Sequence, residues 1–165
     1  HRRQLLRVDP DGVKLHADLS AVAAYHTNDM VVDAVGRAYV GNFGFPLDAE
    51  LKARGVESVI ADHPMTNLAR VDPDGRVHVA AADMHFPNGC VITPDGRTMI
   101  VAETLAMRLT AFDIRADGSL TNRRRWAPLG MRYASARRSE RRAGTGTTLS
   151  ATCAPKSRST RSSRP

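Results

Sequence analysis

Short apolar runs alternate with turn sequences along residues 5–122, and this pattern predicts β-hairpins. One kind of hairpin carries the turn Asp-Pro-Asp-Gly, at residues 9–12 and again at residues 72–75. A looser copy ends at Gly118. Glycine suits the end of such a turn because it adopts positive φ at little cost. We therefore expect antiparallel strands on both sides of each turn.

A second kind of hairpin lies between these and recurs with the same pattern at residues 28–40 and residues 88–100. Asn28 aligns with Asn88, and Gly36 aligns with Gly96. We call the first kind the outer hairpin and the second kind the inner hairpin. Along the chain they alternate as outer, inner, outer, inner and outer, so that each inner and outer pair supplies four strands. Repeats of this length are typical of the blades of a β-propeller.

The long gap between two of the hairpins, residues 42–67, holds one insertion. Residues 46–54 follow a proline with good helix formers but lack a wide apolar face. We expect a short helix or an ordered loop there.

These patterns predict an all-β fold, a partial β-propeller, over residues 1–131. A closed propeller needs about four to eight blades, whereas the hairpins account for about two to two and a half. Because the chain begins with His1 inside a hairpin pattern, we expect an incomplete copy. The predicted core between blades contains Val31, Tyr39, Val91, Ile100 or their immediate neighbours.

Charge divides the chain into two parts. Residues 1–122 contain 12 Lys and Arg against 16 Asp and Glu, whereas residues 123–165 contain 12 Lys and Arg against Glu140 alone. We expect a disordered Arg/Ser-rich tail over residues 132–165, because its composition buries too little apolar surface to offset the entropy of ordering. Such a tail could bind nucleic acid, but it contains no recognised binding module.

No run of 18 apolar residues occurs, so the sequence predicts no membrane span. We expect a cytoplasmic protein. The unpaired edge of an incomplete propeller also predicts self-association.

Three stretches carry a family resemblance: the paired motifs around Asn28 and Asn88, and residues 108–113. Over about residues 5–129 the chain resembles the SMP-30/gluconolactonase/luciferin-regenerating enzyme family. The resemblance implies a six-bladed propeller with a divalent metal, Ca²⁺, Zn²⁺ or Mg²⁺, in its central channel.

The resemblance also implies roles for the two asparagines. Asn88 matches a metal ligand, and Asn28 matches a residue that contacts the substrate or a metal-bound water. An amide oxygen is a suitable neutral ligand for such ions. The implied reaction is the opening of a sugar-type lactone or related ester by metal-activated water.

The chain departs from the family pattern at other positions. The resemblance implies a ligand Glu before Asn28 and a ligand Asp in the blade after Asn88, but no Glu precedes Asn28 and no Asp follows Asp117. His26 stands where some members place a substrate-binding arginine. We therefore expect a fragment of a metal-dependent lactonase-like hydrolase that is inactive as this chain; whether it is an enzyme stays open, and its catalytic residues remain unassigned.

Two other functions stay open: a non-catalytic binding module derived from a propeller, and nucleic-acid binding through the tail. Local roles stay open as well. The two asparagines could cap turns, and Asp29 and Glu103 are interpreted as hydrogen-bonded or solvated at strand ends. The histidines lack metal-ligand spacing, and Cys90 is expected to pack as a small apolar residue.

Overall fold

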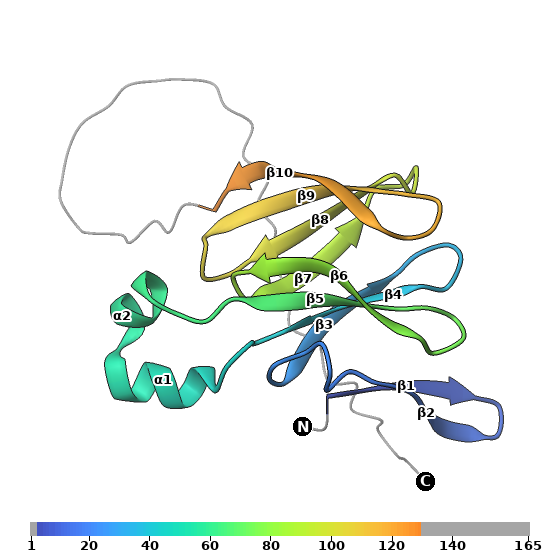
Figure 1. The fold of residues 1–165 in the computed structure, drawn as a ribbon, viewed down its shortest axis with the longest axis horizontal. Coiled ribbons are helices and arrows are strands. Elements are labelled where there is room, and N and C mark those ends of the chain that lie inside the picture. The colour runs from blue at the N-terminus through green and yellow to red at the C-terminus, as the bar shows by residue number, and fades with distance from the viewer. Residues whose placement is uncertain (1–2, 130–165) are drawn as a thin grey trace, which may run out of the picture. The chain divides into compact units, whose positions relative to one another are not determined.

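The computed structural model describes residues 3–129, and these residues form mainly antiparallel β-structure (Figure 1). The predicted all-β class is confirmed. The expectations for the basic tail, including disorder and nucleic-acid binding, lie outside the described residues. No helix within residues 3–129 is long and apolar enough to cross a membrane.

The strands form three sheets in chain order. The first is a hairpin of two strands, β1 (Gln4–Asp9) and β2 (Gly12–Asp18). The second contains four strands: β3 (Thr27–Val32), β4 (Ala38–Asn42), β5 (Thr66–Val71) and β6 (Val77–Met84). The third contains β7 (Pro87–Ile92), β8 (Thr98–Glu103), β9 (Arg108–Ile114) and β10 (Leu120–Pro128).

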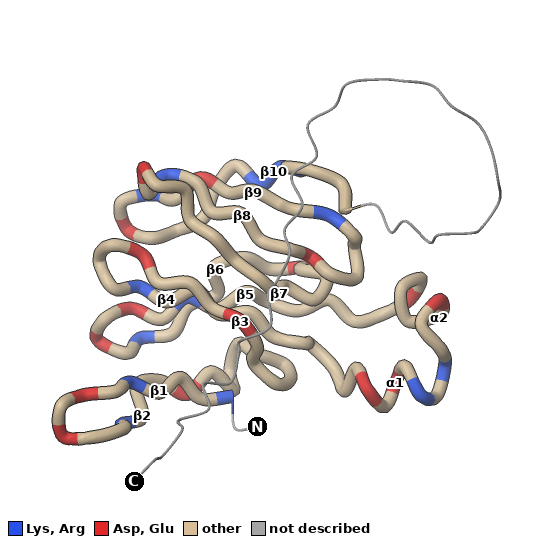
Figure 2. Tube along the Cα trace, turned by 180° about the vertical axis from the view of Figure 1, so that it is seen from behind, with Lys and Arg blue, Asp and Glu red and all other residues tan. Residues whose placement is uncertain are grey.

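Each four-stranded sheet is one inner hairpin joined to one outer hairpin, as the alternating turns predict. Within the second sheet β4 pairs with β5, and within the third β8 pairs with β9, all antiparallel. The inner turns end at Gly36 and Gly96, whose φ angles of 88° and 70° explain why glycine occupies both. Figure 2 shows acidic and basic residues gathered at the hairpin turns.

The insertion between β4 and β5 forms two short helices, α1 (Leu47–Arg54) and α2 (Val56–Ala61). Gly55 separates them with a φ of 77°. Of the two alternatives expected over residues 46–54, a short helix or an ordered loop, the helix forms as α1. It buries none of its residues, in agreement with its narrow apolar face. In α2 only Val59 is buried. Both helices lie beyond one end of the sheets (Figure 1).

Two apolar layers separate the three sheets, because neighbouring residues of β4 point to opposite faces. Ala38 and Val40 face the first sheet and pack in a cluster with Ala17, Leu19, Ala23, Ala69 and Val71. Tyr39 faces the third sheet and packs in a cluster with Leu68, Met84, Met99, Val101 and Phe112. The Tyr39 hydroxyl donates to the carbonyl of Gly118 at 2.9 Å, so this buried polar group is satisfied across the layer.

The predicted core is confirmed at the named residues in the second sheet and at their immediate neighbours in the third. Tyr39 is fully buried, and Val31 packs against its cluster. Val91, however, is 56% exposed, and Ile100 is only partly buried. The register pairs Cys90 with Val101 and Ile92 with Met99, and these four residues face the second sheet. Val91 and Ile100 therefore lie on the other face of the pleat.

The β1–β2 hairpin presents an apolar surface to solvent. Two cross-strand pairs, Leu6 with Leu15 and Val8 with Val13, are more than half exposed. Within the described residues, β1 pairs with β2 alone and leaves its other edge open. An exposed edge with apolar side chains favours association, and self-association stays a prediction.

Candidate functional site

The candidate site begins where two strands from neighbouring sheets run side by side. β3 and β7 are the first strands of their sheets, and they pack against each other (Figure 1). Asn28 is the second residue of β3, and Asn88 is the second residue of β7. The sequence repeat therefore corresponds to equivalent places on adjacent strands.

Asn28 joins the two sheets directly. Its side-chain Nδ2 donates to the carbonyl oxygen of Pro87 at 3.0 Å, so it reaches the residue that precedes Asn88. Its Oδ1 is buried and has no hydrogen-bond partner among the described residues. The interpretation of Asn28 as a local turn cap does not account for this contact, which spans 59 residues of sequence.

Gly41 of β4 makes this close approach feasible. A Cβ atom at position 41 would lie 2.4 Å from the Pro87 oxygen and 2.5 Å from Asn28 Oδ1. Real Cβ atoms do not approach that closely, so only glycine fits. Gly41 lies in a strand and outside any turn signal, so the sequence alone gives no indication of its role.

Asn88 is half-buried and faces a different neighbour. Its Nδ2 donates to the hydroxyl of Thr104 at 3.3 Å, in the loop between β8 and β9. With its nitrogen toward Thr104, the amide has Oδ1 at its other end. Thr104 was not anticipated, since nothing in its local sequence indicates a role.

An acidic side chain lies beside β7. Asp29 is exposed, and its Oδ2 lies 3.9 Å from the position that a Cβ of Gly89 would occupy. Burial raises the pKa of the Cys90 thiol to about 12, and the negative charge of Asp29 adds to the rise. Cys90 is thus a neutral thiol that packs with the apolar layer, as expected.

The donors at this place do not complete a site for a divalent ion. Within residues 3–129, no three side chains of His, Cys, Asp or Glu gather closely enough to hold a metal. Ca²⁺ takes six to eight oxygen ligands, commonly including carboxylates. Asn28 Oδ1 is packed against Gly41, so Asn88 provides the more accessible amide oxygen of the two.

Glu103, at the end of β8, is fully buried and hydrogen-bonded, which confirms the hydrogen-bonded interpretation. Arg108 donates to it at 2.9 and 3.2 Å, and the backbone N–H of His85 donates at 2.9 Å. Thr110 and Arg123 complete its contacts. Burial alone would raise the pKa of this carboxyl, but the hydrogen bonds from Arg108, Thr110 and His85 outweigh it and hold the pKa below its usual value. Glu103 therefore anchors strand ends near the site.

Two histidines form a pair that connects the insertion to the loop before β7. His63 Nε2 lies 3.0 Å from His85 Nδ1, and His63 Nδ1 lies 2.8 Å from the carbonyl oxygen of Val59. A carbonyl only accepts, so His63 Nδ1 carries a proton. When both rings are neutral, His85 therefore donates to His63. The residues are far apart in sequence, which is why spacing did not reveal the pair.

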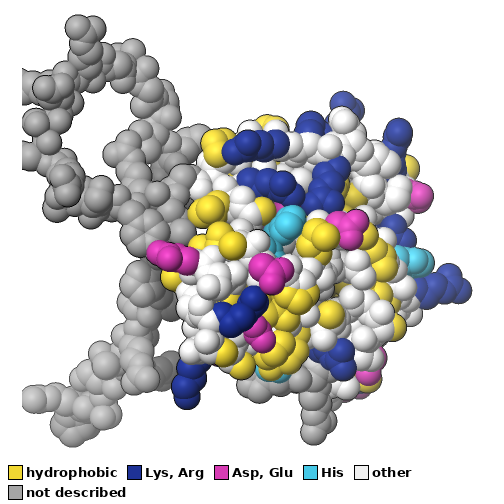
Figure 3. All heavy atoms as spheres, turned by 60° about the vertical axis from the view of Figure 1, so that its left-hand side comes forward, with side chains coloured by type: hydrophobic (Ala, Val, Ile, Leu, Met, Phe, Trp, Pro, Cys, Tyr) yellow, Lys and Arg dark blue, Asp and Glu magenta, His cyan; other side chains and the backbone are white. Residues whose placement is uncertain are grey.

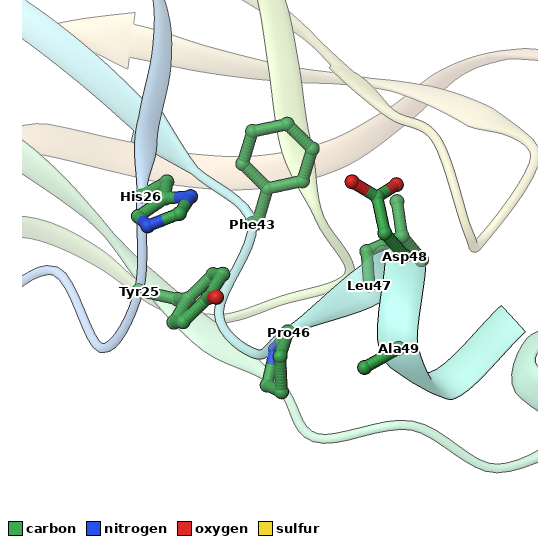
Figure 4. Close-up of a pocket in the computed structure, with 7 residues that line it drawn as sticks. All are labelled: Tyr25, His26, Phe43, Pro46, Leu47, Asp48 and Ala49. Carbon is green, nitrogen blue, oxygen red and sulfur yellow. The ribbon is translucent and has the colours of Figure 1, made fainter. Parts of the chain in front are cut away.

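A recess of about 210 Å³ lies beside the start of β3 (Figure 4). The rings of Tyr25 and His26 stack with centroids 4.0 Å apart on one side, and the beginning of α1 lies on the other. The lining residues are Tyr25, His26, Phe43, Pro46, Leu47, Asp48 and Ala49. The carbonyl of His26 accepts from the N–H of Phe43 at 2.9 Å. The beginning of the insertion thus lies beside the segment that leads into β3.

Gly41→Ala should destabilise the fold by about 1–3 kcal/mol, the usual cost of forcing extra atoms into a packed interior. The contact is with backbone at Pro87, which cannot rotate away. Urea unfolding of the two variants Gly41→Ala and Gly89→Ala measures this. Gly89 is the matched control, because a Cβ there meets only Asp29 Oδ2 at 3.9 Å. Equal stability of the two variants would contradict the close approach.

The His63–His85 pair predicts a loss of stability in mild acid. Burial lowers the pKa of His85 from 6.5, and His63, Arg108 and Arg123 lower it further, whereas Glu103 opposes the shift. The folded chain therefore resists protonation of His85. The contribution of neutral His85 to the free energy of unfolding is fully present above about pH 6.5. It declines as the pH falls from there toward the lower pKa of the folded state.

Urea unfolding between pH 7.5 and 5 measures this effect in wild type and in His85→Asn. The asparagine amide preserves a donor toward His63 but does not titrate, so the pH dependence should flatten. His16→Asn, which removes a half-buried histidine of β2 outside the pair, should retain the wild-type slope. An unchanged slope in His85→Asn would show that the pair does not control the acid response.

Comparison with known proteins agrees with this architecture. A family model described as the SMP-30/gluconolactonase/LRE-like region matches residues 1–135. A gluconolactonase from Xanthomonas campestris is 26% identical, with a TM-score of 0.50; the match covers 75% of this chain and 42% of that protein.

Two structures with lower sequence identity support the fold alone. A calcium-binding protein, regucalcin, from Agrobacterium tumefaciens is 23% identical with a TM-score of 0.54, and the match covers 76% of this chain and 39% of that one. A luciferin-regenerating enzyme is 18% identical with a TM-score of 0.55, over 75% of this chain and 40% of that one. The chain thus spans about two fifths of the length of these structures. With the family match covering most of its length, the chain belongs to the SMP-30/gluconolactonase/LRE-like family.

Proposed function

We propose that this chain carries part of the site of a hydrolase that opens a lactone or a related ester. The observation that supports the proposal is the placement of Asn28 and Asn88 at equivalent positions on β3 and β7, which pack against each other. Family membership supplies the reaction class. A small-molecule lactone or ester is the proposed ligand.

The two asparagines have different proposed roles, because their surroundings differ. Asn88 is half-buried, and its bond to Thr104 leaves the amide oxygen as a ligand for a divalent ion such as Ca²⁺, Mg²⁺ or Zn²⁺. Asn28 uses one Nδ2 hydrogen on Pro87, and the second hydrogen is proposed to contact the substrate. The exposed Asp29 carboxylate adds negative charge beside β7.

We propose that the chain by itself does not hydrolyse lactones. One amide oxygen does not hold a divalent ion tightly, and the described residues bring no further cluster of carboxylates or imidazoles to it. This incomplete set of donors also favours a second candidate, a non-catalytic module that binds a small molecule. The two candidates differ in whether a metal ion contacts Asn88.

Titration with Mn²⁺, observed by NMR, tests the metal contact even when binding is weak. The paramagnetic ion should broaden the Asn88 side-chain amide and the Thr104 backbone amide more than the amide of Asn122, which is bonded to Asp113 on another strand. Asn88→Ala should abolish the broadening at Thr104, and Asn122→Ala should not. Equal broadening at Thr104 in wild type and Asn88→Ala would overturn the metal role.

A turnover assay tests the incomplete site. The chain is incubated with D-glucono-δ-lactone and with γ-butyrolactone, each with Ca²⁺, Mg²⁺, Mn²⁺ or Zn²⁺, and acid release is followed. We expect no metal-stimulated hydrolysis above the rate without protein. Metal-dependent turnover that Asn88→Ala abolishes would show that other residues of the chain complete the site.

A further inference from the structure

We propose that an apolar recess next to Asn88 binds a hydrocarbon arm of the ligand, so that the preferred ligand is an alkyl-substituted lactone or ester rather than a polyhydroxylated sugar lactone. The inference rests on the proposed function, because it assigns the ligand class of the same site. It is carried by a second cavity, separate from the one beside β3.

This second recess has a volume of about 400 Å³ and lies between the insertion and two loops of the third sheet. Four of its side chains come from α1 and α2, and the others come from residues that flank β7, β8, β9 and β10. They are Leu47, Leu51, Val56, Ile60, Phe86, Thr104, Leu105, Met107 and Leu129. Figure 3 shows apolar side chains gathered on the face of the molecule that Figure 1 has on its left, where both helices lie.

Thr104 connects the recess with the candidate site. The same hydroxyl that accepts the Asn88 amide at 3.3 Å belongs to a residue of the recess wall. For a ligand whose reacting group lies at Asn88, the recess is therefore only one side chain away, that of Thr104. Continuity of this kind favours a single ligand that occupies both places.

The side chains that line the recess favour a hydrocarbon arm on the ligand. Among the described residues that line the recess, Thr104 alone has a polar side chain, whereas the others offer only hydrocarbon or thioether. The hydroxyl groups of an aldonolactone would lose water there without gaining partners. An alkyl arm has no such cost, and each methylene it buries strengthens binding by about fourfold.

Packing between buried side chains holds the wall of the recess in shape. Two residues of the wall, Phe86 and Leu105, belong to a buried cluster with Phe45 and Val59, and the rings of Phe43 and Phe86 stack with centroids 4.7 Å apart. The hydrogen bond between His63 and His85 joins the end of the helical insertion to the loop that carries Phe86. A preformed apolar cavity of this size is typical of small-molecule sites.

The test compares two lactones that share one ring, using the full chain. γ-Dodecalactone carries an eight-carbon arm, and γ-butyrolactone carries none. Dissociation constants come from ligand-observed NMR titration. We expect γ-dodecalactone to bind at least tenfold more tightly, and we expect Val56→Trp, which fills the recess, to remove at least tenfold of that affinity.

Matched variants distinguish binding in the recess from non-specific hydrophobic binding. Val56 is 47% exposed, and Val79 of β6 is 52% exposed but outside the recess, so Val79→Trp should leave both affinities unchanged. Val56→Asp, which places a charge in the wall, should weaken γ-dodecalactone as Val56→Trp does. Equal affinity for the two lactones, or no effect of either Val56 substitution, would overturn the inference.

Asn88→Ala distinguishes failure of the recess inference from failure of the proposed function. If the ring sits at Asn88, this substitution weakens both lactones by a similar factor, whereas Val56→Trp weakens only the one with an arm. If Asn88→Ala changes neither affinity while Val56→Trp still acts, the recess binds hydrocarbon, but the assignment of lactone binding to Asn88 is wrong.

Discussion

The packing of β3 against β7 is the constraint on which the site depends. The two strands belong to different sheets, and the contact is close because Gly41 has no side chain where Pro87 and Asn28 meet. The Asn28 amide then spans the gap to the Pro87 carbonyl. The buried apolar layer of Tyr39, Met99 and their neighbours holds the same two sheets together. Packing and one polar bridge thus bring the two repeat copies into register and place Asn28 and Asn88 at the same end.

The elements around β3 and β7 provide the recess walls and the anchoring contacts that these two strands do not supply. The insertion contributes α1 and α2, which lie at that end; α1 lines both recesses, and α2 lines the apolar one. The buried carboxylate of Glu103 fixes Arg108 and the His85 backbone, and the two histidines fasten the insertion to the loop before β7. The result is an arrangement in which amide groups lie beside an apolar cavity. Such an arrangement suits a ligand with one polar and one hydrocarbon part.

Much of the fold was predictable from sequence because turns and repeats are local signals. The Asp-Pro-Asp-Gly turns and the paired asparagines predicted the alternating hairpins and their order. Residues 46–54 predicted a short helix or an ordered loop, and the helix α1 forms there. In the third sheet the core residues are the immediate neighbours of Val91, which the prediction had left as alternatives, because alternation alone does not fix which set of side chains faces inward. Gly41, Thr104 and the His63–His85 pair were missed, since each acts through a contact that only folding creates.

The candidate site depends most directly on the contact from Asn28 to the first residues of β7. A nuclear Overhauser experiment on the labelled chain measures this, since the Asn28 side-chain amide donates to Pro87 at 3.0 Å. We predict cross-peaks from the Asn28 Nδ2 protons to protons of Pro87 and to the backbone amide of Asn88, and these should persist at neutral pH. Cross-peaks from Asn28 only to its own neighbours in β3 would contradict the shared site.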